Sequence, residues 1–141
     1  MLHFFQEIIL NTTQEMEFVD LTKRAQDCVK KSGIQNGLLI VATQHTTTAV
    51  ILNEKEEGLQ KDMALFLGKL AAARQGYLHD RSPVDGRTNA HSHLQSLLLP
   101  SSQTVPLVDG EIKLGSWQSL FFVELDGPRS SRRVTVQVVG A

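Results

Sequence analysis

Hydrophobic and polar positions alternate at both ends of the chain in a way that predicts strands. Residues 3–10 mix aromatic and β-branched side chains in near alternation and predict a first strand. The unbroken apolar run at 37–42 and the run at 49–52 predict one long bent strand or two separate strands. The pattern of the last third predicts four further strands, at 103–107, 111–114, 117–124 and 133–139. It also predicts two turns, at 108–110 and 126–129.

Helical spacing of apolar residues appears between these strand regions. It predicts a helix over 20–31, a second over 55–70 with its buried face on Leu59, Met63, Phe66 and Leu70, and a short third from residue 90. A β-rich last third after helix-rich segments predicts an α+β fold, with a largely antiparallel sheet covered by helices on one side. A chain of 141 residues fits one domain, residues 1–141.

Composition and charge narrow the function classes. Lys and Arg number 14 against 15 Asp and Glu, so the chain lacks the basic excess that nucleic-acid binding requires, and we expect no nucleic-acid partner. No apolar run approaches the length of a membrane span, so we expect no membrane partner. The single cysteine, Cys28, fits a buried thiol in a reducing cytoplasm.

The polar stretch from Tyr77 to Leu94 interrupts this regular pattern and contains three of the five histidines. It is either a solvated loop or a site. His45, His79 and His93 come from three separate segments, which is how an open metal site with three protein ligands is usually assembled. The alternative is that each histidine only forms local hydrogen bonds.

Helix geometry separates His91 from His93. On a helix that begins by Ala90, two residues apart in sequence point about 200° apart, so only one of the two can join a site with His79. Geometry does not say which one; we choose His93 on the family pattern given below, and expect His91 at the surface or behind the site. Asp80 is a candidate partner for His79.

Other polar residues have both a chemical and a structural interpretation. Glu54 is a candidate general acid or base, or simply part of a helix start. Arg129 and Arg132 follow a turn and are candidates to hold a phosphate, or form a solvated tip. Trp117 is expected to pack in the core, while Gln118 beside it fits either interpretation.

Four segments, QHTTTAVILNE, YLHD, NAHSHLQSLLL and LGSWQSLFFVELDGPR, resemble the YjbQ-type (UPF0047) family over essentially the whole chain. The resemblance implies a β-sandwich-like subunit, a homotrimer and, from some members, secondary thiamine-phosphate synthase activity. Ser116 replaces the usual threonine of the signature, and residues 99–102 replace a glycine-containing turn. The family's recurrent polar positions fall here on His45, Thr46, Asn53, Glu54, Asp62, His79, Asn89, His93, Trp117, Gln118 and Glu124.

Two functions follow as expectations. The first is a thiamine-phosphate synthase with His45, Glu54, His79 and His93 as catalytic residues, and with Asn89, Gln118, Arg129 and Arg132 binding substrate or phosphate. A divalent metal would be bound by His45, His79 and His93; histidines favour a zinc-like ion, whereas the chemistry favours magnesium. The second is a non-catalytic trimeric protein that binds a phosphorylated metabolite or an anion, and a purely structural trimer is the third.

Overall fold

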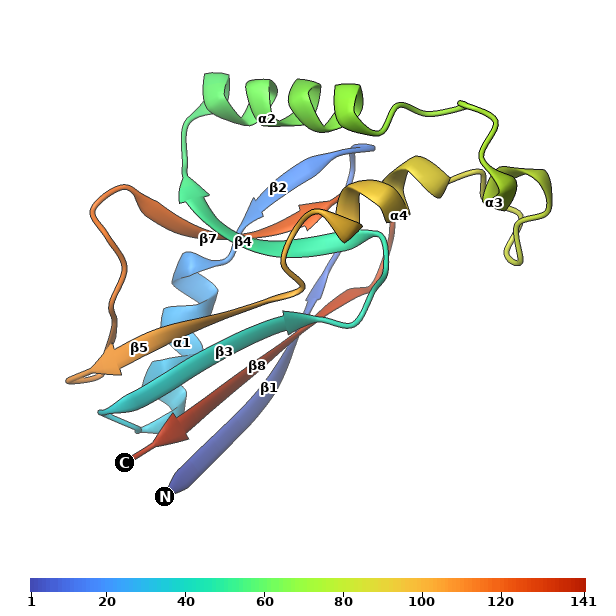
Figure 1. The fold of residues 1–141 in the computed structure, drawn as a ribbon. Helices are drawn as coiled ribbons and strands as arrows, with labels where there is room; N and C mark the ends of the chain where they lie inside the picture. Colours follow the sequence, from blue (N-terminus) through green and yellow to red (C-terminus); the bar gives the residue numbers. More distant parts are fainter.

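A computed structural model describes residues 1–141, which form two antiparallel sheets and four helices (Figure 1). The larger sheet has the strand order β1 (Leu2–Leu10), β8 (Arg132–Gly140), β3 (Gly37–Thr43), β5 (Ser102–Val108) and β6 (Glu111–Ile112). The smaller sheet has the order β2 (Glu17–Asp20), β7 (Gln118–Glu124) and β4 (Thr48–Glu54). The predicted α+β class with antiparallel sheets is confirmed.

The main core lies between the two sheets and is closed by α1 (Thr22–Ser32). Alternate side chains of each strand enter it, because successive residues of a strand point to opposite faces. Val136 of the larger sheet and Phe122 of the smaller are both fully buried there. Cys28 joins them from α1 with 2% exposure, so its predicted burial is confirmed.

Two helices, α2 (Glu57–Leu70) and α4 (Ala90–Leu97), lie on the other face of the smaller sheet, and the short α3 (Leu78–Arg81) lies beyond the edge of the sheet in the connection between them (Figure 1). A second core under α2 contains Leu67, Phe121 and Val123. The predicted buried face of α2 is wrong at its end, since Leu67 packs inside while Phe66 and Leu70 are more than half exposed. None of the four helices is both long and apolar enough to cross a membrane.

The structure also revises details of the other elements. Residues 37–54 form two strands, β3 and β4, in different sheets. There are four helices instead of about three, because the loop over 77–87 contains the single turn α3. Strand β2 was not predicted. Trp117 is 76% exposed at the start of β7, so the prediction that it packs in the core is wrong.

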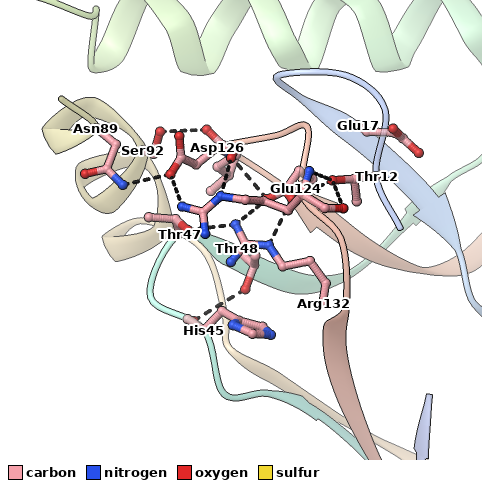
Figure 2. Close-up of polar contacts among 12 residues, drawn as sticks. Thr12, Glu17, His45, Thr47, Thr48, Asn89, Ser92, Glu124, Asp126 and Arg132 are labelled. Atoms are coloured by element: carbon pink, nitrogen blue, oxygen red, sulfur yellow. Dashed lines mark hydrogen bonds and ion pairs between the residues drawn. The ribbon is translucent and has the colours of Figure 1, made fainter. Parts of the chain in front are cut away.

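A buried ion pair joins the two sheets. Glu124 at the end of β7 is fully buried, and it accepts hydrogen bonds from Arg132 at the start of β8 (Nε to Oε1 2.9 Å, Nη2 to Oε2 2.6 Å). Thr12 donates to the same carboxylate at 2.7 Å, and Thr47 accepts from Arg132 at 2.9 Å. Each member of the pair is therefore also hydrogen-bonded to a threonine at the point where the sheets meet (Figure 2).

Replacing Glu124 with glutamine should destabilise the fold strongly, because it leaves the Arg132 charge buried without a counter-charge. We expect a loss of about 3 kcal/mol or more in the free energy of unfolding, measured by chemical denaturation. Glu7→Gln is the matched control, since Glu7 pairs with Arg133 on the solvent-facing side and should contribute less than about 1 kcal/mol. Equal effects of the two substitutions would contradict the role assigned to the buried pair.

Candidate functional site

The polar network continues from the ion pair into the turn after β7. Asp126, two residues beyond Glu124, accepts hydrogen bonds from three side chains: Arg87 (Nε to Oδ2 3.0 Å, Nη2 to Oδ1 3.1 Å), Asn89 (2.7 Å) and Arg129 (2.7 Å). Burial alone would raise the pKa of Asp126, but these donated hydrogen bonds outweigh it and lower the pKa to about 2. Asp126 is thus a fixed carboxylate that orders the segments around it (Figure 2).

Asn89 connects Asp126 to His79 by hydrogen bonds. Its Nδ2 donates to Asp126, which fixes the orientation of the amide and leaves Oδ1 to face His79 Nε2 at 2.8 Å. An amide oxygen only accepts, so His79 Nε2 carries the proton and Nδ1 is the basic nitrogen. A chain from carboxylate to amide to imidazole therefore sets the tautomer of His79, as second-sphere groups do for histidines that bind metals or transfer protons.

His93 lies beside His79, with ring centroids 4.9 Å apart and the ring planes at 70°. His79 comes from α3 and is exposed, whereas His93 comes from α4 and is half-buried. The two rings line a shallow hollow of about 240 Å³ together with Tyr77, Ala90 and Leu94. Asp80 does not contact His79 in the way we expected: its Oδ1 instead accepts from the Ala90 backbone N–H at 3.0 Å, at the start of α4.

His45 occupies a different position. Its Nε2 accepts from the Arg133 backbone N–H at 2.9 Å, so its proton is on Nδ1. Burial first and the positive charge of Arg132 second lower the pKa of His45, which favours the neutral ring. In one chain, no three side chains of the His, Cys, Asp or Glu type are arranged to hold a metal ion. The structure therefore brings His79 and His93 together without His45.

The remaining predicted residues divide between two ends of the smaller sheet. Glu54 and Gln118 pair across β4 and β7 at one end, while Thr48 pairs with Glu124 at the other. Seven strand residues separate these ends by about 20 Å. Glu54 and Gln118 are thus far from the His79–His93 pair within one chain. Asp62 is exposed and does not approach a histidine.

The two candidate arginines differ in their availability to a phosphate. Arg132 is 4% exposed, and its Nε and Nη2 are engaged by Glu124 and Thr47, so little of its guanidinium is open to a phosphate. Arg129 is partly exposed at the rim, where its Nε and Nη2 donate to Asp126. Arg87, which the sequence did not single out, holds the centre of the network. Nothing in its local sequence pattern marks it, because its importance comes from a contact with Asp126, 39 positions away.

Together, these features define an α+β domain of two packed sheets, with a histidine-containing polar site at one end of the smaller sheet. The chain belongs to the family described as UPF0047 protein YjbQ-like, whose profile matches residues 6–141. UPF0047 proteins of Methanothermobacter thermautotrophicus and Archaeoglobus fulgidus are each 42% identical to it, over 97% and 94% of this chain and 92% and 99% of their own lengths.

Solved structures support the same relationship. A YbjQ-like protein of unknown function from Sulfolobus solfataricus superposes with a TM-score of 0.93 at 34% identity, covering 99% of this chain and 98% of that one. A hypothetical protein from Aeropyrum pernix gives a TM-score of 0.89 at 32% identity, over 98% and 99% of the two chains. The family resemblance seen in the sequence is confirmed over nearly the whole chain.

The low pKa of Asp126 predicts how stability depends on pH. A folded-state pKa of about 2 lies below the usual value of 3.8, so the carboxylate stabilises the fold above about pH 4 and the contribution is lost as the pH falls from about 4 to about 2. Asp126→Asn should lower the free energy of unfolding near neutral pH by about 2 kcal/mol, and should flatten its decline in that acid range. Chemical denaturation at a series of pH values measures both effects.

Asp27→Asn is the control for this experiment. Asp27 forms an exposed pair with Lys23 at 3.5 Å, so its replacement should change the free energy of unfolding by less than about 1 kcal/mol. If the free energy of unfolding of Asp126→Asn declined between pH 4 and pH 2 as steeply as that of the unmodified protein, the stabilising role assigned to the Asp126 carboxylate would be wrong.

Proposed function

We propose that the protein is a transferase acting on phosphorylated small molecules, with thiamine-phosphate synthesis as a secondary activity and another, native reaction. In thiamine-phosphate synthesis, a ring nitrogen of the thiazole phosphate forms a bond to the methylene carbon of hydroxymethylpyrimidine diphosphate as the carbon–oxygen bond to diphosphate breaks. The observation that supports a chemical role is the chain of contacts from Asp126 through Asn89 to His79, which presents a basic nitrogen of defined tautomer beside His93. The lone buried Cys28 fits our proposal that this takes place in the cytoplasm.

The two histidines can serve the departing diphosphate in two ways. A protonated imidazole can donate a proton to the leaving oxygen, or carry positive charge next to it. Arg129 at the rim of the network offers a guanidinium in the same region. These roles require no group beyond this chain's own residues.

The proposed divalent, zinc-like metal has two of its three ligands in one chain. His79 with its tautomer fixed and His93 beside it suit such an ion, but His45 is engaged by Arg133. The residues of a single chain thus do not complete the site. The metal proposal then requires a third ligand from another copy of the chain.

A homotrimer is proposed on the basis of the uncovered face of the larger sheet. No helix lies over this face, which exposes Phe5, Ile9, Leu38 and Val108 among polar residues. Apolar side chains gathered on one face in this way are typical of subunit contacts.

Substituting Ile9 with glutamate should place a charge on this face, near the end of β1, and separate the subunits. Sedimentation velocity is expected to show a trimer for the unmodified protein and a monomer for Ile9→Glu. Leu65→Glu is the control, since Leu65 is 62% exposed on α2, away from this face, and should leave the trimer intact. A monomeric unmodified protein would exclude the trimer.

A non-catalytic binding protein is the second candidate, and the state of the arginines favours it. Arg87 and Arg132 are both paired with carboxylates, which leaves little uncompensated positive charge to stabilise a diphosphate as it departs. Such a protein would bind a phosphorylated metabolite at the same network without turnover.

His93→Gln tests these functions directly. The purified protein, with its zinc content measured, is supplied with hydroxymethylpyrimidine diphosphate and thiazole phosphate, and thiamine phosphate is quantified. We expect product from the unmodified protein and a loss of about 100-fold or more in His93→Gln, because a group that transfers a proton or holds charge at the reacting atoms is removed.

His3→Gln is the matched control, since His3 is an exposed histidine of β1 that lies outside the network. Substrate binding without product formation would replace the transferase by the binding protein. Equal turnover by His93→Gln and the unmodified protein would exclude His93 from the reaction.

A further inference from the structure

A second hollow lies on the side of α4 opposite to His93. It has a volume of about 450 Å³, and its walls are mostly apolar, formed by Met16, Ala64, Gly68, Ala71 and Leu125. It adjoins a larger, more polar hollow of about 730 Å³ that reaches Arg74 and Arg87, and both are bordered by Glu15 and His91. Volumes of this size are those of small-molecule sites.

Gln95 presents an unsatisfied acceptor at the apolar end. Its side chain is 2% exposed, and its Nε2 donates to the carbonyls of Leu67 (3.4 Å) and Ala71 (3.1 Å) at the end of α2. Because both partners are acceptors, the amide cannot be reversed, and Oε1 is the atom left without a partner. A buried carbonyl without a donor is unfavourable, so an N–H group from a ligand would satisfy it.

His91 and Glu15 extend this end of the site. His91 is four residues before Gln95 on α4 and therefore lies on the same face of the helix. Its Nε2 is 3.6 Å from Glu15 Oε1, and its Nδ1 is buried without a partner. Glu15 and Gln95 both accept hydrogen bonds, so this end suits a ligand that carries an amino group.

The opposite end presents two guanidiniums, and one of them is paired with Asp126. Asp126 holds Arg87 through Nε and Nη2, which fixes the guanidinium and leaves Nη1 to donate. Arg74 is exposed on the same hollow. A fixed guanidinium next to an exposed one suits a phosphate or another anionic group.

We propose that this pocket binds an amino-substituted, phosphorylated small molecule of nucleotide size, with its amino group toward Gln95 and Glu15 and its phosphate toward Arg74 and Arg87. The site goes beyond the proposed function, because His91 and Gln95 face away from the His79–His93 pair. His91, which we expected at the surface or behind the site, thereby gains a binding role of its own.

Three probes separate the two ends of the pocket, with binding followed by calorimetry and by amide chemical shifts. Adenosine monophosphate carries both an exocyclic amine and a phosphate, inosine monophosphate has a carbonyl in place of the amine, and adenosine lacks the phosphate. We expect saturable binding of adenosine monophosphate at millimolar concentration or below, with shifts at residues 14–16 and 91–95, and at least about tenfold weaker binding of the other two. No saturable binding of adenosine monophosphate, or equal binding of all three, would overturn the proposal.

Arg74→Asn tests the phosphate end without threatening the fold. Arg74 has a φ of 59°, a left-handed conformation that asparagine adopts readily, and its side chain is exposed. Binding of adenosine monophosphate should weaken about tenfold, whereas Arg24→Gln, at an exposed arginine on α1, should leave it unchanged. Equal affinities of Arg74→Asn and Arg24→Gln would show that the phosphate does not bind at this pocket.

Discussion

The buried pair of Glu124 and Arg132 is the interaction on which the rest of the structure depends. It joins β7 of the smaller sheet to β8 of the larger one, and Thr12 and Thr47 each add one further hydrogen bond to the pair. A charge buried this completely is tolerable only with its partner, so any arrangement that separates the two sheets at this point is strongly disfavoured. The pair therefore fixes both ends of the connection over 125–131.

That connection carries the site. Gly127 within it lies so close to the segment before β2 that an added Cβ would be 2.0 Å from the Gln14 carbonyl oxygen, and its N–H donates to the backbone carbonyl of Glu15 at 2.9 Å. Only glycine fits there, which gives a physical reason for the glycine in the turn over 126–129. The same contact places Asp126 toward α4 on one side and Glu15 on the rim of the His91 pocket on the other.

Periodicity predicted most of the elements, and helix geometry placed one site residue correctly relative to another. The spacing of His91 and His93 on α4 was enough to foresee that they diverge, and His93 does lie beside His79. The local sequence pattern could not predict which groups the arginine side chains contact. Arg132 resembles a residue of a solvated turn, and its burial becomes clear only when Glu124 is found next to it. The pattern also could not assign β3 and β4 to different sheets, because that depends on the partners of each strand. Trp117 misled for the same reason: an aromatic residue at a strand start packs only if another element covers it.

The division of the polar residues between two ends of the smaller sheet limits what one chain can do alone. Glu54 and Gln118 pair at one end, and the network around Asp126 is anchored at the other, about 20 Å away along β4 and β7. A single small substrate cannot contact both groups within one chain. Either the two ends act separately, with Glu54 and Gln118 serving the fold or another ligand, or the ends meet between copies of the chain. In the second case the exposed Trp117 beside Gln118 would be covered by the neighbouring copy, which would explain why so large an apolar side chain is 76% exposed in an isolated subunit.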